Sequence, residues 1–282
     1  MDSLLLVCVV ILCNAGFSVI QKEYTMKMKG AGLAFNALVP LFAMPVFLFY
    51  GWQFSFSMEV LSFAIAFAGA FGGAIIFMLL AFRWGSVAQT SLIVSYSLLI
   101  PTMYGVFYLK EPLTAMKIMG LLLVAVSLYL INAGVKEKKI SCKWIIAVVL
   151  AFFCNGMCST IQKIQGLVFH GRYITEFMIV ALAMVCICFT ITSVIQCRGR
   201  FREEIKQTWP YALAAGVLNG SVNLLIMVLN GKMPASLMFP LIAEGSLIIL
   251  FAVSVFRYKE VVTTKQKLGF CAGLIAVALL NI

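Results

Sequence analysis

One carboxylic acid, Glu244, lies within a long apolar stretch, residues 233–256, that contains no other charged residue. An ionised carboxylate at the centre of a bilayer costs at least about 2.5–3.5 kcal/mol, so this group should be neutral, paired or in contact with water. A carboxyl that exchanges a proton at that depth could couple the movement of another molecule to a proton gradient, or it could bind an amine. The alternative is a protonated structural carboxyl that bonds to a neighbouring helix.

Two polar stripes of the same composition lie in two further apolar stretches. Their residues are spaced i, i+4 and i+7, which places each set on one face of a helix. Such faces predict either the hydrogen-bonding walls of a cavity or interhelical hydrogen bonds, each worth about 0.6 kcal/mol. The stripes are Asn14, Ser18 and Gln21 in the first stretch, and Asn155, Ser159 and Gln162 in the second.

More polar residues lie beside prolines or glycines. Pro101 and Pro240 each free a backbone carbonyl and can kink a helix beside polar side chains, whereas Gly216 and Gly220 are expected to be packing residues. The candidate substrate-binding residues are Asn14, Ser18, Gln89, Ser95, Tyr96, Asn155, Ser159, Asn219, Asn223 and Glu244, and Glu244 is also the candidate coupling residue.

These residues lie in a chain that is too apolar for a soluble enzyme or binding module. The chain is 63% apolar and 11% charged, whereas soluble domains average roughly 45–50% and about 25%. A transmembrane helix needs about 20 apolar residues, and this chain therefore predicts an all-α membrane protein with ten transmembrane helices and short loops. The ten stretches are 3–21, 30–58, 60–82, 84–109, 118–135, 144–162, 177–197, 207–231, 233–256 and 268–282.

The charge of +11 is interpreted as loop charge and not as a nucleic-acid site. Most lysines and arginines lie in the odd-numbered loops, which predicts that these loops are cytoplasmic and that both termini face outward. Nine cysteines with a single histidine, His170, cannot form a Cys/His zinc site. A Walker phosphate loop is also lacking. We therefore expect neither a metal nor a cofactor.

An internal repeat organises the chain. The segment Cys13–Lys22 shares six residues with Cys154–Lys163 at one constant separation, and Gly69-x-x-x-Gly73 has a later counterpart in Gly216-x-x-x-Gly220. The signature Phe-x-x-Lys-Glu-x-x-Thr, followed by a glycine, occurs at Phe107–Thr114 and at Phe256–Thr263. The separation between these signatures, counted back from Glu244, gives Ser95, so the carboxylate itself is not duplicated.

These repeats predict two five-helix units, residues 1–133 and 143–282, joined by a charged linker over 134–142. Because five is odd, the second unit enters the membrane from the opposite side. Inverted repeats with a substrate site near the bilayer midplane are typical of secondary transporters. Glu111 and Glu260, at the ends of helices, are interpreted as interfacial anchors or as caps of the helix that follows each of them.

Two five-helix repeats, each with a Lys-Glu pair before a final glycine-bearing helix, resemble the drug/metabolite transporter superfamily, and within it the EamA-type transporters. The resemblance covers essentially the whole chain and implies a helical cavity that opens alternately to either side. It also implies that helices 5 and 10 are peripheral or self-associating, so a homodimer is an expected assembly. Many such relatives have both termini in the cytoplasm, which is the reverse of the charge prediction.

The leading prediction is a secondary-active carrier of a small metabolite or drug-like molecule, working by alternating access and exporting its substrate in exchange for protons. A translocator of nucleotide sugars, phosphorylated metabolites or lipid carriers is the alternative. Phosphate ligands need Lys or Arg, and since no basic residue lies deep in a predicted span, a neutral, zwitterionic or cationic substrate is favoured. An integral membrane enzyme is a third class, but it needs clustered acidic groups and histidines at depth. One glutamate within a span and no histidine there are too few for such a site. The expected location is a bacterial inner membrane.

Overall fold

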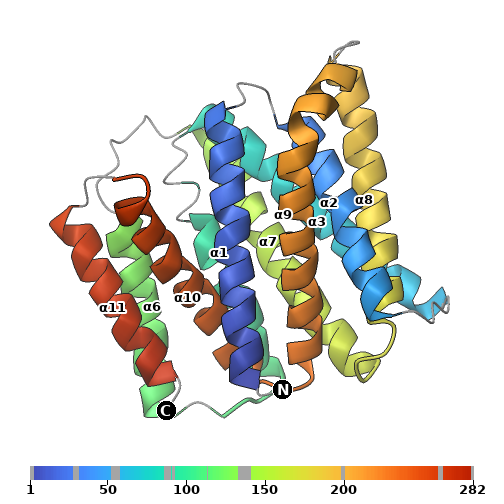
Figure 1. Cartoon of the computed structure of the whole chain (residues 1–282). Helices are drawn as coiled ribbons and strands as arrows, with labels where there is room; N and C mark the ends of the chain where they lie inside the picture. Colours follow the sequence, from blue (N-terminus) through green and yellow to red (C-terminus); the bar gives the residue numbers. More distant parts are fainter. Residues whose placement is uncertain are drawn as a thin grey trace. The chain divides into compact units, whose positions relative to one another are not determined.

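The computed structural model describes residues 3–27, 32–51, 58–85, 90, 93–112, 114–132, 141–197, 201–259 and 263–280. Every regular element in these ranges is a helix, as the apolar composition predicted. Figure 1 shows α1 (Ser3–Lys27), α2 (Leu33–Tyr50), α3 (Met58–Trp84), η1 (Tyr96–Leu98), α5 (Leu99–Met103), η2 (Tyr104–Tyr108), α6 (Ala115–Asn132), α7 (Cys142–Val168), α8 (Ile174–Cys197), α9 (Phe201–Asn230), α10 (Ala235–Phe256) and α11 (Thr264–Leu280).

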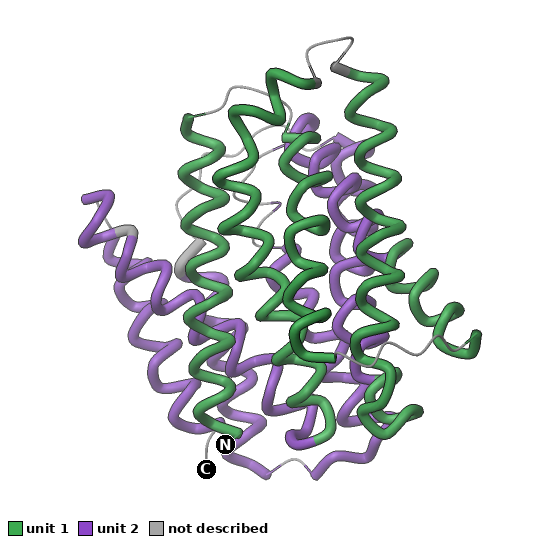
Figure 2. Tube along the Cα trace, turned by 45° about the vertical axis from the view of Figure 1, so that its right-hand side comes forward, with its two compact units in different colours: residues 1–69, 164–231 green, residues 70–163, 232–282 purple. Residues whose placement is uncertain are grey.

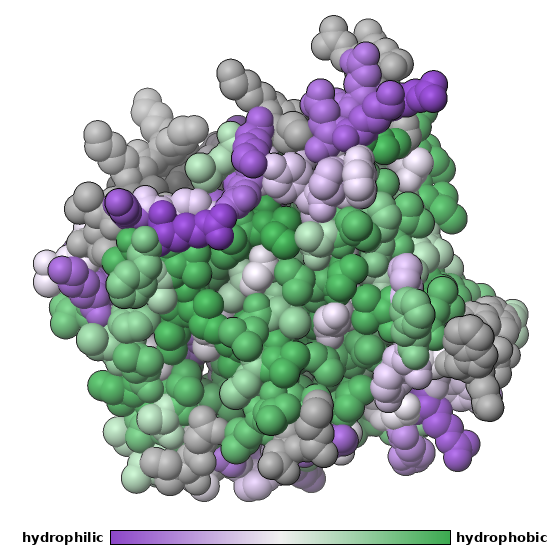
Figure 3. Space-filling view, in the orientation of Figure 1, coloured by the Kyte–Doolittle hydropathy of each residue, from purple (hydrophilic) through white to green (hydrophobic). Residues whose placement is uncertain are grey.

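Seven of these helices, α1, α2, α3, α7, α8, α9 and α10, are long and apolar enough to cross a membrane. Three further predicted spans contain shorter helices: Ile93–Tyr108, α6 and α11. The chain is therefore a multi-pass membrane protein, while the full count of ten crossings stays a prediction. Apolar side chains cover the sides of the helices in Figure 3.

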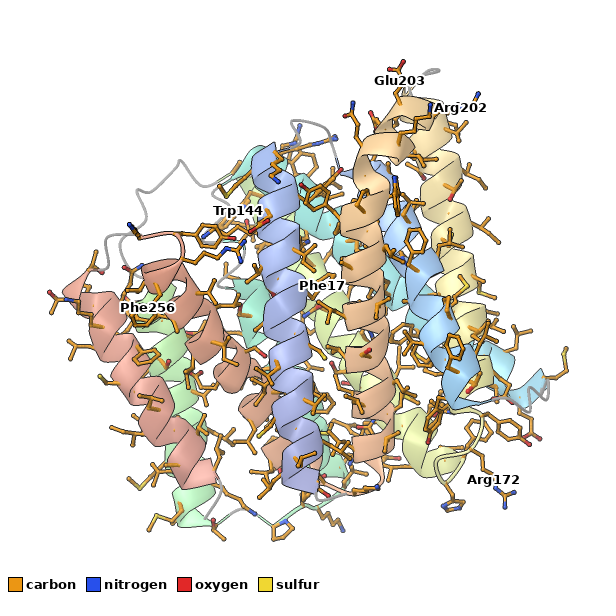
Figure 4. The ribbon with its side chains drawn as sticks, viewed as in Figure 1. Phe17, Trp144, Arg172, Arg202, Glu203 and Phe256 are labelled. Carbon is orange, nitrogen blue, oxygen red and sulfur yellow. The ribbon has the colours of Figure 1, made fainter. Side chains whose placement is uncertain are left out.

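Charged residues lie beyond the ends of α8. Arg172 precedes its first turn, and Arg202 and Glu203 follow its last turn at the start of α9 (Figure 4). In Figure 3, hydrophilic surface covers the end of α8 where α9 begins. Because a charge inside the hydrocarbon is costly, this placement fits a helix that spans it.

Pro101 lies where the fourth predicted span leaves regular α-helical geometry. The backbone changes from the 3-10 turn η1 through the short α5 to the π-helix η2. Proline has no N–H and its ring clashes with the carbonyl four residues earlier, which disrupts the regular hydrogen-bond ladder. The predicted distortion beside Ser95 and Tyr96 is therefore present, whereas Pro240 lies inside the continuous helix α10.

Two compact units make up the chain (Figure 2). Unit 1 contains residues 1–69 and 164–231, and unit 2 contains residues 70–163 and 232–282. Each unit thus combines helices from both predicted repeats. The predicted repeat boundary falls in the linker, of which residues 134–140 lie outside the described ranges.

In unit 1, α2 packs against α8 and α9, and α1 packs against α9. Two glycines of α9 allow this close approach. A Cβ on Gly216 would come within 2.8 Å of the carbonyl oxygen of Val39, and a Cβ on Gly220 within 2.8 Å of that of Ala43. Both glycines are therefore placed as packing residues.

Replacing Gly220 with leucine is expected to destabilise unit 1 by about 1–3 kcal/mol, the usual cost of overpacking. The clash is with the backbone of α2, which cannot move aside as a flexible side chain could. Thermal unfolding in detergent measures the effect. Gly69→Ala is the matched control, because a Cβ there meets nothing within 4 Å, and an equal midpoint for both variants would contradict the packing role.

Candidate functional site

Glu244 lies on α10 of unit 2, where this helix packs against α6 and α11. Its side chain is 0% exposed. The hydroxyl of Ser127 on α6 donates a hydrogen bond of 2.6 Å to Glu244 Oε1. From α11, Gly273 faces the same oxygen, and a Cβ on this glycine would overlap Oε1 and lie 2.9 Å from Ser127 Oγ. The carboxyl therefore fills space that exists because residue 273 has no side chain.

The second oxygen of Glu244 has a different environment. Oε2 is buried and has no hydrogen-bond partner among the described residues. A buried charge without a compensating partner is strongly unfavourable. This geometry consequently fits the neutral acid form, with a proton on the carboxyl in the conformation seen here.

The contacts of Glu244 match the structural alternative that the sequence left open, a carboxyl bonded to a neighbouring helix. In this conformation the fully buried carboxyl presents no surface to a molecule outside the protein. Ser127 and Gly273 were not candidates from sequence, because an isolated serine and a glycine in apolar helices carry no distinguishing pattern. Ser95, the counterpart of Glu244 in the repeat, is half-buried.

The polar stripe of α1 lies opposite the exposed apolar face of that helix. Asn14 and Ser18 are half-buried, while Leu5 and Leu12 on the other side are exposed. Since an exposed apolar face on a membrane helix meets lipid, the stripe faces the protein. Ser18 donates its hydroxyl to the carbonyl oxygen of Asn14 at 3.0 Å, a bond within the helix.

The polar stripe of α7 likewise lies opposite the exposed apolar face of its helix. Asn155 is exposed and Ser159 is half-buried, and the amide of Asn155 donates to Ser97 Oγ of η1 at 2.6 Å. Four exposed apolar residues of α1 have exposed apolar counterparts on α7 at the separation of Cys13 from Cys154. These pairs are Leu4 and Ile145, Leu5 and Ile146, Val9 and Leu150, and Leu12 and Phe153.

The remaining candidates make local or interhelical hydrogen bonds. The Tyr96 hydroxyl donates to the carbonyl oxygen of Ala125 on α6 at 2.8 Å. The Asn223 amide donates to Asn219 on the same helix, at 2.9 Å to the carbonyl oxygen and 3.2 Å to Oδ1. Gln89 lies outside the described residues.

The candidates are distributed over both units. Asn14, Ser18, Asn219 and Asn223 belong to unit 1, and Ser95, Tyr96, Asn155, Ser159 and Glu244 belong to unit 2. Within unit 2, the bond of Glu244 to Ser127 and that of Asn155 to Ser97 form two separate polar contacts.

Glu111 corrects the sequence interpretation. It caps a helix, but that helix is α10 and not the following helix α6. The backbone N–H groups of Ala235 and Ser236 donate to its Oε1 and Oε2, each at 2.8 Å. The N-cap residue of α10, Pro234, makes no side-chain capping bond of its own. A carboxylate from far along the chain thus satisfies the free N–H groups of the first turn.

Lys163 is a second correction, because the sequence placed it in a loop. Helix α7 continues beyond it to Val168, and the side chain is only 3% exposed. Its Nζ donates to the carbonyl oxygen of Met233 at 2.9 Å, and its charge interacts with that of Glu111. The apolar residues Ile164 and Leu167, which follow Lys163, were the signal that the helix continues.

The two copies of the Lys-Glu signature share an uncommon backbone conformation. Lys110 and Lys259 have positive φ angles of 53° and 51°, which few residues other than glycine adopt. The preceding turn is widened in the same way in both copies. Leu109 N–H donates to Tyr104 O at 3.2 Å, and Tyr258 N–H donates to Val253 O at 3.4 Å.

The helices after the two signatures begin alike. Thr114 directly precedes α6, and its Oγ1 accepts the N–H of Lys117 in the first turn at 3.3 Å. Thr263 directly precedes α11, and its Oγ1 accepts the N–H of Gln266 in the first turn, also at 3.3 Å. A side-chain oxygen that accepts such an N–H is the usual N-cap of a helix. The repeat therefore extends from sequence to local structure.

Helices α6 and α11, equivalent in the predicted repeats, pack against each other in unit 2 (Figure 1). Gly120, near the start of α6, would meet Leu280 at the end of α11 if it carried a Cβ, and Gly273 would meet Ser127, further along α6. The two helices are therefore antiparallel.

Another equivalent pair, α2 and α8, packs together in unit 1. The end of α2 meets the start of α8, where Thr175 donates its hydroxyl to the carbonyl oxygen of Phe47 at 3.3 Å. Gly51, which ends α2, lies against the same threonine. In an antiparallel pair the C-terminus of one helix lies beside the N-terminus of the other, as it does here.

Comparisons with known proteins agree with this architecture. Residues 2–133 match the model of the EamA-like transporter family. Twenty-nine chains of solved structures match, and one of them, titled "Crystal structure of protein", has a TM-score of 0.77 over 98% of this chain and 95% of its own at 13% identity. That similarity shows the fold alone, and no curated protein matches the sequence. Residues 2–133, which contain the first copy of the signature, thus match the EamA-like transporter family, and this match is consistent with the drug/metabolite transporter superfamily.

Proposed function

We propose that this protein is a secondary-active transporter of a small metabolite or drug-like molecule, built from two inverted five-helix repeats and working by alternating access. The match of residues 2–133 to a transporter family supports a carrier in place of an enzyme. The two repeats would then form opposite halves of one passage, each opening to one side of the membrane.

The observation that carries this proposal is the antiparallel packing of equivalent helices. If the two five-helix units have opposite topology, each helix must run opposite to its counterpart. The pair α6 and α11 does so, and its preceding signatures share the positive φ at Lys110 and Lys259. The contact between α2 and α8 supports the same relation.

The chemistry of the polar stripes supports a substrate without a phosphate group. The stripes consist of amides and hydroxyls, and Asn155 is exposed on the polar face of its helix, as a wall of a water-filled passage would be. The buried cation Lys163 already donates to a backbone carbonyl and interacts with Glu111. We therefore favour a neutral, zwitterionic or cationic compound over a phosphorylated metabolite or a nucleotide sugar.

Glu244 is the proposed coupling residue. In the conformation seen here its neutral carboxyl is enclosed by α6 and α11. Separation of α10 from these helices would expose the group to water, where it can lose its proton. Proton loss on one side and uptake on the other would couple substrate movement to a proton gradient.

A thermal-shift screen of the purified protein against amino acids, sugars, nucleosides, cationic drugs and sugar phosphates tests the substrate class. A ligand at about one hundred times its dissociation constant stabilises a protein by roughly 2.7 kcal/mol. We expect a dose-dependent rise in the unfolding midpoint with an amine or zwitterion, followed by flux of that compound into proteoliposomes. Stabilisation by sugar phosphates alone would contradict the proposed substrate class, and absence of flux for every stabilising compound would contradict a carrier.

A further inference from the structure

The start of α10 is held by a carboxylate from another part of unit 2. Pro234 precedes the helix and makes no side-chain cap. The N–H groups of Ala235 and Ser236 donate instead to the two oxygens of Glu111, each at 2.8 Å. The partial positive charge at a helix N-terminus adds to the attraction for a carboxylate.

A buried lysine reinforces this contact. Lys163 on α7 donates to the carbonyl oxygen of Met233, just before α10, and its charge attracts that of Glu111. The ammonium and the carboxylate thus hold the same turn of backbone, one from α7 and the other from the loop after η2. Each group satisfies a backbone partner that would otherwise be buried without a hydrogen bond.

The local backbone is shaped to deliver Glu111. The positive φ of Lys110 turns the chain after η2, and the N–H of Glu111 donates to the carbonyl oxygen of Gly105 at 3.1 Å. A Cβ on Gly105 would lie 2.6 Å from Glu111 Oε2 and 3.0 Å from the Cβ of Ala235. Only glycine at this position leaves room for the carboxylate.

The groups come from both predicted repeats. Glu111 follows the fourth predicted span, in the first repeat, whereas Lys163 follows the sixth and α10 is the ninth, both in the second repeat. If the protein alternates its access, elements of the two repeats must separate at one end in each cycle. Charge-assisted hydrogen bonds suit such a contact, because they are strong when dry and water can replace them when the contact opens.

We propose that Glu111, Lys163 and the first turn of α10 form a latch, which is closed in this structure and must release before α10 moves away from the ends of η2 and α7. This α10 latch rests on the proposed carrier function. It gives α10 two polar attachments, one at its start and one at Glu244. Release of the first would allow the second to reach water.

Distances between two spin labels test the latch. Phe107 on η2 and Lys232 before α10 are both exposed in unit 2, so each can be replaced by a labelled cysteine in a cysteine-free background. Wild-type latch residues should give mainly one short distance. Glu111→Gln and Lys163→Met should each raise the ratio of a longer-distance population to the short one by about tenfold, the factor for a loss of 1.4 kcal/mol.

The control Glu203→Gln alters an exposed carboxylate on α9 of unit 1 and should leave the distances unchanged. An unchanged distribution in Glu111→Gln overturns the latch. A lower unfolding midpoint with unchanged distances overturns it as well, because a static cap would behave in this way.

The labels report opening without any substrate, so this test is independent of transport. If the variants open but the protein transports no compound, the latch proposal stands and the carrier proposal is contradicted. If the protein transports a compound but neither substitution changes the distances, only the latch proposal is contradicted.

Discussion

Replacing Glu244 with glutamine is expected to abolish proton-coupled flux while the protein stays folded. The amide keeps the size of the carboxyl and an oxygen that can accept the hydrogen bond from Ser127, but it cannot release or take up a proton. The measurement uses proteoliposomes loaded with a pH-sensitive dye, to which the compound with the largest thermal shift is added. Wild-type protein should move protons with that compound, and the variant should not.

The variant should still exchange labelled for unlabelled compound across the membrane, because glutamine imitates the protonated state. Glu59→Gln, an exposed carboxylate in the first turn of α3, is the matched control and should retain coupling. Proton movement by Glu244→Gln at the wild-type rate would show that this carboxyl is structural only.

The second large effect is expected from Gly273→Val. The new side chain would occupy the position of Glu244 Oε1 and approach Ser127. Overpacking costs about 1–3 kcal/mol, and a buried carboxyl oxygen that loses its hydrogen bond adds roughly 1–3 kcal/mol. The unfolding midpoint in detergent should therefore fall markedly, and proton coupling should be lost.

Ser127→Ala separates the two contributions, because it removes the hydrogen bond without adding volume. Its destabilisation should be smaller than that of Gly273→Val. The double variant Gly273→Val with Ser127→Ala should lose less than the sum of the single losses, since both remove the same bond. Full additivity would mean that the glycine and the serine do not act through a shared carboxyl.

Helix positions followed closely from the sequence. In a bilayer every backbone polar group must be satisfied within the segment, so a long apolar stretch has few alternatives to a helix. The end of α7 is the instructive exception. Lys163 looked like the start of a loop, because a lysine at the end of an apolar stretch usually reaches the interface. The helix instead continues past Lys163, whose side chain is buried with its Nζ donating to the carbonyl oxygen of Met233.

The candidate site followed from the sequence only in part. The charge of Glu244 in an apolar stretch made it a candidate without any structure, and the repeat made the polar stripes of α1 and α7 comparable. The contacts of these residues could not be predicted, because Ser127 precedes Glu244 by 117 positions and resembles any other serine in a membrane helix.

The amino-acid order alone thus specified the membrane helices, the repeated signature and the residues that are costly to bury, because these depend on local composition and spacing. Three-dimensional packing decided that Glu244 bonds to Ser127 beside Gly273 and that Glu111 caps α10 instead of α6. Which polar groups meet depends on how helices from distant parts of the chain approach one another. A buried group takes whichever partner that approach supplies, since leaving it unsatisfied is costly.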